Sequence, residues 1–315
     1  MFLALTLLFI STRMGARAST DWCQPVRTFP APPPGFDPTT ASDTALEMYG
    51  LPPRPPDMDL GALAAWTDGM SRLQAVSPPN PVCGTTQHAA PSYHASYGGI
   101  WAGHVALNSY FNGQRFTWSE SRWFQPGVPS DSNYSNSDFA HAPAASFWTG
   151  IGHNYVIQAG VDSAATSTAQ YRCWTEDYPA KTVWEGPVIH PGDKAYVYLH
   201  YQGNGTTYYF LENVSTGHAQ SFTNATPYVA TASGDFINER ITGYYLPDFS
   251  LASVMDNYFG TDSKTHQLTG ASSTKFVITS DCTSTGKVLS KPSGVAADGS
   301  FTQYWYASRP FTDFC

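Results

Sequence analysis

The stretch Phe147-Trp-Thr-Gly-Ile-Gly-His-Asn-Tyr-Val-Ile-Gln-Ala-Gly-Val-Asp162, followed by Tyr171-Arg-Cys-Trp-Thr-Glu-Asp-Tyr-Pro179, decides the fold because polar and apolar residues alternate along it. Alternate residues of a β-strand point to the same face. Gln158 and Asp162 therefore share one face of the first strand, with apolar residues on the other. On the second strand Glu176 shares a face with two aromatic residues, Trp174 and Tyr178. The pattern predicts a sheet face on which an amide, carboxylates and aromatic rings converge.

A plainer interpretation stays open at this point. Antiparallel sheets commonly expose one polar face to water, and alternation by itself is then no more than the signature of a solvated surface. Alternation alone therefore does not separate a solvated face from a functional site, and the specific residue motifs must decide.

Composition indicates an all-β protein. Of the 315 residues, 13% are charged and 15% aromatic, and 26 Gly and 24 Pro favour short strands joined by turns. Many short strands without a helix-length periodic segment predict a sandwich or jelly roll of two antiparallel sheets. The expected strands are Ile100–Val105, Phe116–Phe124, Ser146–Gly150, Tyr155–Asp162, Tyr171–Asp177, Ala195–Tyr201, Thr207–Asn213, Asp235–Ile241, Ser250–Met255, Lys275–Ser280 and Phe301–Tyr306.

Charge and motifs exclude several classes of function. The net charge is −8 and no run of basic residues occurs, which argues against a nucleic-acid partner. After the N-terminus no segment is apolar enough to cross a membrane. The sequence has no His-Glu-x-x-His helix and no metal-type cysteine spacing, so we expect neither metal nor cofactor. A monomer is expected.

The first 91 residues differ in kind from the rest. Residues 1–18 combine an apolar run with an Ala-x-Ala site, as a secretory signal peptide does, so the protein is expected to be secreted. Residues 19–91 are Pro-rich, and residues 40–50 read as a short helix with Ser42 as N-cap and Gly50 as C-cap. Residues 59–73 are a second candidate helix. This part is either a prosegment or a structural arm, and residues 92–315 are the β domain.

Cysteines and sequons fit a secreted protein. Five cysteines leave one thiol unpaired, and Cys173 is expected to be that free, buried residue because it lies mid-strand opposite the polar face. The simplest pairing of the others is Cys23–Cys83 and Cys282–Cys315. Four Asn-x-Ser/Thr sequons permit glycosylation: Asn133, Asn204, Asn213 and Asn224.

Several blocks together resemble the glutamic peptidases of the eqolisin family. In chain order they are Trp101-Ala-Gly103, Trp123-Phe-Gln-Pro126, Trp148-Thr-Gly-Ile151, Ile157-Gln-Ala-Gly-Val-Asp162, Tyr171-x-x-Trp174-x-Glu176-x-Tyr178-Pro179 and Asp235-Phe-Ile-Asn-Glu-Arg240. The similarity covers roughly residues 95–310. Each block is weak alone, but the ordered set is specific.

The resemblance implies a jelly-roll sandwich whose site holds a Gln/Glu dyad. Gln158 matches the catalytic glutamine, and Trp148 matches a tryptophan that contacts substrate. The surrounding residues are matched by Asp162, Trp174, Glu176 and Glu239. Asp235 stands where the family has its catalytic glutamate, with a side chain shorter by about 1.5 Å. Gly152 stands where the family usually has Asp, and Arg172 is a further difference.

The chemistry of such a pair can be followed without the family name. A carboxylate takes a proton from water as the water attacks an amide carbon, and returns it to the leaving nitrogen. A glutamine N–H donates to the oxyanion that forms. The sequence thus predicts a secreted acid endopeptidase acting on extended peptides, with Gln158 and Asp235 catalytic, although Glu239 could be the working carboxylate instead.

Two other functions stay open. A β-sandwich with aromatic side chains in a groove is also how secreted carbohydrate- or cell-wall-binding modules hold their ligands, and a catalytically impaired relative could serve in that way. A glycosidase would instead use two carboxylates, for which Asp162 and Glu176 are the candidates, roughly 5–10 Å apart across the groove.

Overall fold

The computed structural model describes the β domain almost throughout and the preceding part in short pieces. The described residues are 27–28, 33, 35–42, 45–46, 67, 74–75, 82–83, 100–139, 142–152, 155–178, 182–203, 205–226, 232–241, 246–249, 251–280 and 286–306. No helix among them is long and apolar enough to span a membrane.

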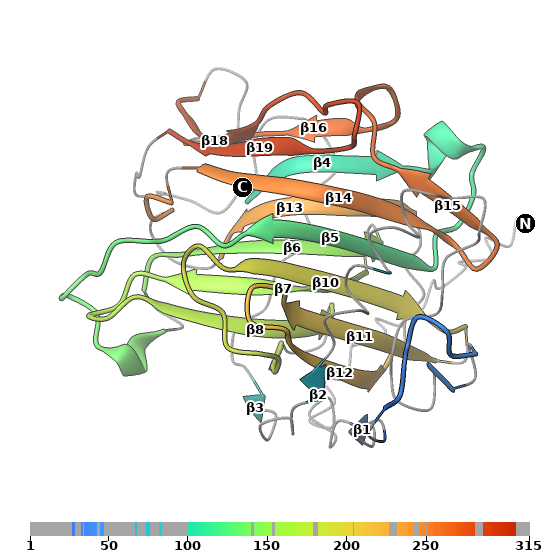
Figure 1. Ribbon diagram of the computed structural model, residues 1–315. Helices are drawn as coiled ribbons and strands as arrows, with labels where there is room; N and C mark the ends of the chain where they lie inside the picture. Colours follow the sequence, from blue (N-terminus) through green and yellow to red (C-terminus); the bar gives the residue numbers. More distant parts are fainter. Residues whose placement is uncertain are drawn as a thin grey trace, which may run out of the picture.

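Two β-sheets pack face to face (Figure 1). The larger one contains β1 (Arg27–Thr28), β2 (Gln74–Ala75), β5 (Trp118–Phe124), β10 (Lys194–Tyr201), β11 (Thr206–Asn213), β12 (His218–Ala225), β14 (Leu251–Thr261), β15 (Lys264–Gln267), β17 (Ile278–Thr279), β18 (Val288–Pro292) and β19 (Phe301–Trp305). The smaller one contains β3 (Val82–Cys83), β4 (Trp101–Leu107), β6 (Ala144–Gly152), β7 (Val156–Ala164), β8 (Gln170–Asp177), β9 (Val183–Trp184), β13 (Ser233–Arg240) and β16 (Thr274–Phe276).

The pairing is antiparallel except between β2 and β12. The larger sheet runs in the order β1-β12-β11-β10-β5-β14-β19-β18-β17, with β15 beside β14 and β2 beside β12. The smaller sheet runs β16-β4-β13-β6-β7-β8-β9-β3. Short 3-10 helices follow β4 and precede β6 and β16, at Asn108–Phe111, Asn136–Asp138 and Gly270–Ser272. This is the all-β sandwich that the sequence predicts.

Each expected strand has a counterpart, usually shifted by one or two residues, and Lys275–Ser280 is split between β16 and β17. Other strands were not predicted, β12 and β18 among them. In β12 the residues that face inward are Gln220, Phe222 and Asn224, so the inner face offers only one large apolar side chain. A single apolar residue gives no period-2 signal, so the sequence pattern does not predict this strand.

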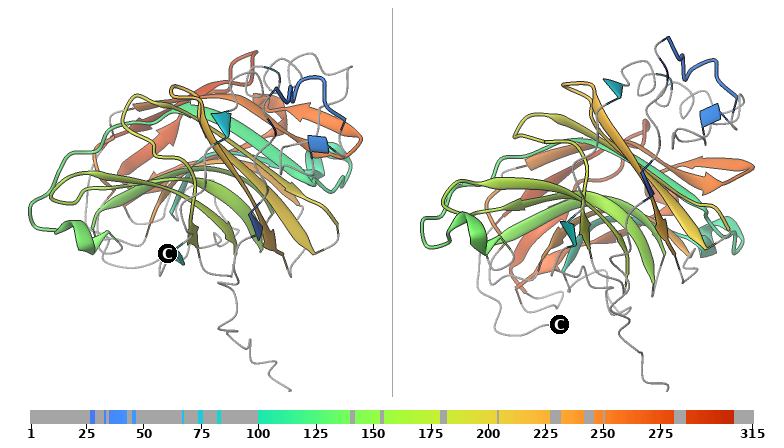
Figure 2. Two further views of the ribbon diagram at one scale, coloured as in Figure 1. Left: turned by 60° about the horizontal axis from the view of Figure 1, so that its bottom comes forward. Right: turned by 90° about the horizontal axis from the view of Figure 1, so that it is seen from below.

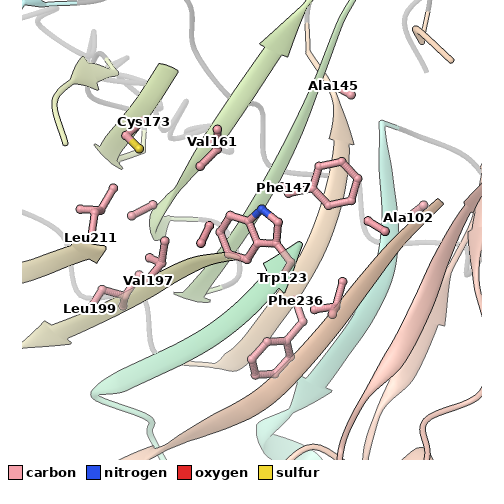
Figure 3. Close-up of a cluster of buried hydrophobic side chains, with 14 of the residues drawn as sticks. Ala102, Trp123, Ala145, Phe147, Val161, Cys173, Val197, Leu199, Leu211 and Phe236 are labelled. Carbon is pink, nitrogen blue, oxygen red and sulfur yellow. The ribbon is translucent and has the colours of Figure 1, made fainter. Parts of the chain in front are cut away.

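The core lies between the two sheets and explains the alternation (Figure 3). Ile157, Ala159 and Val161 of β7 pack inward, as does Cys173 of β8. They meet side chains of the larger sheet such as Trp123, Val197, Leu199 and Leu211. The apolar half of the alternating stretch is therefore the core, as expected, and the polar half points away from it.

Cys173 is buried and free, as predicted, and its thiol donates to the Pro187 carbonyl oxygen at 3.2 Å. Burial raises the pKa of this thiol well above its usual range, so it is inert as a nucleophile. Of the four cysteines expected to pair, Cys23, Cys282 and Cys315 lie outside the described residues, and only the backbone of Cys83 is described.

The expected helix near residue 40 is present in its first turn. Ala45 and Leu46 are helical, and the Ser42 hydroxyl accepts the Ala45 N–H at 3.3 Å, so Ser42 is the N-cap. Gly50, the expected C-cap, lies outside the described residues. Of the second candidate helix, 59–73, only Thr67 is described, and it is helical.

The fold separates the sequons. The Asn213 amide donates to the Val188 carbonyl and to Asp193, and the Asn224 amide donates to Thr175 between the sheets. Neither nitrogen can carry a glycan while it is held in this way. Asn133 lies on an exposed loop and stays compatible with glycosylation, and Asn204 lies outside the described residues.

Two carboxyl groups are buried between the sheets where β8 and β9 meet β11 and β12. Thr226 donates to Asp177 at 2.8 Å, and Thr175 donates to Glu185. Burial raises the pKa of Asp177 to about 7 and that of Glu185 to about 8. Both groups therefore hold protons in acid that they would release from the unfolded chain.

These two groups predict a fold that loses stability as the pH rises. Below about pH 4 their contribution to the free energy of unfolding is complete, because both groups are protonated in the folded and in the unfolded state. Between that pH and about 7 to 8 the folded state binds more protons, so the free energy of unfolding falls. Asp177→Asn should make the fall shallower, measured as urea unfolding free energies from pH 4 to 8.

The exposed Asp298 provides the matched control for this experiment. Its pKa is lowered by hydrogen bonds from Ser300, so Asp298→Asn should leave the slope above pH 4 as in the parent. An equal change of slope in both variants, or none in Asp177→Asn, would contradict the assignment.

Candidate active site

The predicted polar face lies on the outer side of the smaller sheet, where the strand register arranges it in rows. In the first row Asp235 of β13 is opposite Gly150 of β6, Gly150 is opposite Gln158 of β7, and Gln158 is opposite Glu176 of β8. Cross-strand partners point to the same face, so these residues form one line across four neighbouring strands. Val105 of β4 continues the line beyond Asp235.

A second row, two residues along each strand, is aromatic. Ile237, Trp148, Gly160 and Trp174 follow one another across the same four strands, and Trp184 of β9 lies opposite Trp174. The two glycines, Gly150 in the first row and Gly160 in the second, leave room for the large side chains beside them.

The third row holds the other predicted carboxylates. Glu239 of β13, Ser146 of β6, Asp162 of β7 and Arg172 of β8 are successive partners, and Trp101 of β4 lies opposite Glu239. Asp235 and Glu239 are four residues apart on one strand, a distance of about 13 Å along the sheet. Glu239 therefore shares a row with Asp162 and not with Gln158.

The face is not a solvated surface. Gln158 and Glu176 are 1% exposed, and Asp162, Asp235 and Glu239 are 0% exposed. Trp148 and Trp174, at 2% and 0%, are equally enclosed. Carboxylates are almost never buried to this degree unless they are paired or serve a function. The plainer interpretation of the alternation is therefore wrong for this face.

Hydrogen bonds link the predicted residues within and between rows. Gln158 Nε2 donates to Glu176 Oε2 at 3.1 Å. Trp148 Nε1 donates to Glu239 Oε2 at 2.9 Å, and Trp174 Nε1 donates to Ser146 Oγ at 3.1 Å. Glu176 thus orients the amide of Gln158, and Glu239 orients the indole of Trp148.

Asp235 has a different environment from the other carboxylates. Neither of its carboxyl oxygens accepts a hydrogen bond of good geometry in the described part of the chain, although the Ser233 hydroxyl lies near. Burial raises the pKa of Asp235 well above its ordinary value, opposed more weakly by the neighbouring Ser233. Strongly perturbed carboxyl groups are concentrated at functional sites.

Gly150 separates Gln158 from Asp235 in the first row. The two residues stand two strand spacings apart, about 10 Å between Cα atoms. A Cβ at Gly150 would lie 2.7 Å from the Ile157 carbonyl oxygen and 3.1 Å from Gln158 Cβ. The Trp148 ring is equally near, with Cζ3 3.1 Å from that Cβ position, so the missing side chain at Gly150 makes room for this indole.

Arg172, at the end of the third row, stacks on two aromatic rings. Its guanidinium lies 4.1 Å from the Phe139 ring centroid and 4.7 Å from that of Trp184, and it donates to Gln170 at 2.9 Å. Burial lowers its pKa, and the charge of Asp162 opposes that effect. Asp162 therefore faces a cation at the border of the site.

Trp101 and Trp184 also belong to this face, although the sequence did not single them out as site residues. The rings of Trp101 and Trp148 meet edge to face, with centroids 4.8 Å apart. The buried indole N–H groups of Trp101 and Trp184 have no acceptor in the described part of the chain. Trp101, Gly103 and Val105 are spaced two residues apart, and this spacing was the sequence signal that could have placed Trp101 on the face.

The described residues contain no group of three or more His, Cys, Asp and Glu side chains placed to hold a metal ion. What the face does contain is an amide donor, a perturbed carboxyl group and an aromatic lining. That set can carry proton transfer and oxyanion stabilisation.

Comparison with known proteins gives one matching family. The sequence profile of the Peptidase A4 family matches residues 99–297. The comparison with curated protein sequences found no significant match.

Solved structures share the fold. The structure titled as Scytalido-glutamic peptidase with a peptide-based transition-state analogue is 16% identical, with a TM-score of 0.52, over 66% of this chain and 98% of that chain. SCP-B, described as a member of the eqolisin family in complex with the tripeptide Ala-Ile-His, is 15% identical, with a TM-score of 0.50 and the same coverage. At such identities the likeness establishes the sandwich alone.

The crowding at Gly150 yields a testable expectation. Gly150→Ala should destabilise the protein by about 1–3 kcal/mol, because the new methyl group meets a backbone oxygen and the base of Gln158. Urea unfolding at acid pH measures the change. Gly294→Ala is the matched control, since nothing lies within 4 Å of a Cβ at that position. Equal stability of the two variants would show that the packing around Gly150 does not require a glycine.

Proposed function

The chain belongs to the Peptidase A4 family, and on this premise we propose that it is an endopeptidase that hydrolyses peptide bonds in acid. The observation that carries the proposal is the register that sets Gln158 and Asp235 on one row with Gly150 between them. We place the scissile peptide group and the attacking water between this amide donor and this carboxyl group, above the Gly150 backbone, once substrate has entered the site.

Asp235 serves first as general base and then as general acid. Its ionised form takes a proton from water while the water oxygen bonds to the amide carbon. The carbonyl oxygen becomes an oxyanion. When the tetrahedral intermediate collapses, the C–N bond breaks and Asp235 returns its proton to the leaving nitrogen. No metal or cofactor enters these steps.

Gln158 serves as the oxyanion donor. Its amide nitrogen carries two hydrogens, and one of them is held by Glu176. The other is available to the developing negative charge. A neutral amide does not titrate, so this donor works equally well at any acid pH. The bond to Glu176 fixes its direction in advance, which saves reorganisation at the moment of reaction.

The remaining site residues support this pair. Glu239 holds the Trp148 indole by its 2.9 Å hydrogen bond, and Trp148 and Trp174 form the wall along which an extended peptide lies. Asp162 and Arg172 close the far end. Because Glu239 lies about 13 Å along β13 from Asp235, we assign the working carboxylate to Asp235.

Substrate must gain access to this site. Gln158, Asp235, Trp148 and Trp174 are all enclosed in the full-length chain, so hydrolysis requires that part of the cover moves. Opening also hydrates Asp235, and hydration weakens the desolvation that raises its pKa. Access and ionisation of the base are thereby coupled.

The two alternatives fit the geometry less well. Asp162 and Glu176 stand four residues out of register on neighbouring strands, about 13 Å apart along the sheet, which is more than a glycosidase pair requires. A sugar-binding module would give the buried row of Gln158, Glu176 and Asp235 no task, whereas peptide hydrolysis uses all three. We further propose that the protein is secreted, on the strength of its signal-like N-terminus.

Substitution of the pair tests the proposal directly. The parent should cleave casein or a peptide library in acid, and Gln158→Ala and the isosteric Asp235→Asn should each lower kcat/KM by about 100-fold or more. Gln202→Ala, a substitution in a loop of the larger sheet, should leave it unchanged. Full activity in Asp235→Asn would refute the role of Asp235, and Asp235→Glu shows whether the shorter side chain limits the rate.

The pH dependence provides a separate test of the base. Since burial raises the pKa of Asp235, kcat/KM should rise with pH on an acid limb centred above the ordinary aspartate value of about 4. Residual hydrolysis by Asp235→Asn should lack this limb. An acid limb that persists in Asp235→Asn would assign the base to another carboxylate.

A further inference from the structure

The outer face of the larger sheet is covered by a segment that precedes the sandwich in sequence. This docking face consists of aromatic side chains of β5, β10, β11 and β14, namely Trp118, Tyr196, Tyr198, Phe210 and Tyr258. Leu46 is fully buried in the same cluster, and Phe36 and Ala41 pack against it. Figure 2 shows this blue segment beside the larger sheet and away from the green strands β6 to β8.

The segment carries its own internal structure. Asp37 Oδ1 accepts the backbone N–H of Thr39 at 2.9 Å and its hydroxyl at 2.6 Å. Ser42 begins a helical turn whose Leu46 N–H reaches the Ser42 carbonyl oxygen at 2.9 Å. Local hydrogen bonds thus satisfy part of its backbone, so side chains alone can make the contact with the sheet.

Next to this aromatic cluster, on the same face, lies a charged network that is also largely enclosed. The Tyr196 hydroxyl donates to Glu120 at 2.5 Å, and the Arg122 guanidinium pairs with Asp256 at 3.0 Å. The Arg122 guanidinium also lies 4.2 Å from the Tyr196 ring centroid. Glu120 and Arg122 are buried although they lie on an outward-facing surface. Such enclosure requires a fitted cover, since charged residues on an outer sheet face otherwise stand in water.

Strand pairing adds further contacts between the first 91 residues and the sandwich. β1 and β2 both pair with β12, at one edge of the larger sheet, and β3 pairs with β9 at the edge of the smaller one. Edge strands are protected by such additions. The same part of the chain therefore contacts both sheets.

We propose that this aromatic face is a docking surface for residues 35–42 and 45–46, and that it holds the N-terminal part of the chain on the sandwich after the connecting chain is cut. The anchors are Leu46 and Phe36. They pack into an aromatic cluster that is buried in the full-length chain. The docking face lies on the sheet that does not carry Gln158 and Asp235, so retention of this segment is compatible with an open site.

The experiment uses the full chain with a specific protease sequence placed over residues 86–91. After cleavage, the N-terminal fragment should co-elute with the sandwich in size exclusion at physiological ionic strength. Leu46→Asp should release it, because a carboxylate cannot be buried among these rings without a partner. Thr40→Asp, which places the same charge on an exposed residue of the segment, should not. Release from the parent, or retention in Leu46→Asp, would overturn the proposal.

A second measurement avoids dependence on a destabilising variant. A photo-crosslinking amino acid at position 46 of the intact chain should link to peptides of β10 and β11, and the same probe at position 40 should not. Links from position 46 to β6, β7 or β8 would refute the docking face. Leu46→Ala should also lower Tm by about 5–10 °C. None of these readouts depends on peptidase activity.

Discussion

The register of four antiparallel strands is the constraint on which the rest of this structure depends. β13, β6, β7 and β8 align so that Asp235, Gly150, Gln158 and Glu176 form one row on the outer face. Because successive side chains alternate between faces, a slip of one residue in any of these strands would send its polar residues into the core. The core residues Ile157, Ala159 and Val161 prevent that slip. Packing between the sheets thus fixes the chemistry on the opposite face.

Two opposite environments for carboxyl groups follow from this arrangement. Glu176 and Glu239 accept hydrogen bonds from Gln158 and Trp148, and these bonds set the direction of the amide and the indole. Asp235 has no such well-formed hydrogen bond in the described part of the chain, and burial dominates the shift of its pKa. Between the sheets, Asp177 and Glu185 keep their protons for the same reason. The folded state gains from acid at Asp177 and Glu185, because there these two buried carboxyl groups stay neutral and cost little to enclose.

The outer faces of the two sheets carry different kinds of side chains. The smaller sheet presents the amide, the carboxylates and the tryptophans of the candidate site. The larger sheet presents an aromatic face on which Phe36, Ala41 and Leu46 of the same chain pack. The contacts of the N-terminal part with both sheets join these faces into one unit. A substitution in the N-terminal segment that packs on the larger sheet can therefore alter the stability of the whole sandwich without altering the candidate site.

The sequence by itself determined the class of fold, most strands, the free Cys173 and the face that carries Gln158, Asp162, Glu176 and Trp174. Period-2 alternation reports the two faces of a strand directly, and this holds wherever one face is apolar. It failed for β12, whose inner face bears only one large apolar side chain, Phe222. Only the tertiary structure decided that the polar face is enclosed, that Asp235 and not Glu239 is in register with Gln158, and that Phe36 and Leu46 lie on the opposite sheet. Those facts depend on strand order and on contacts between distant segments, and no local pattern encodes them.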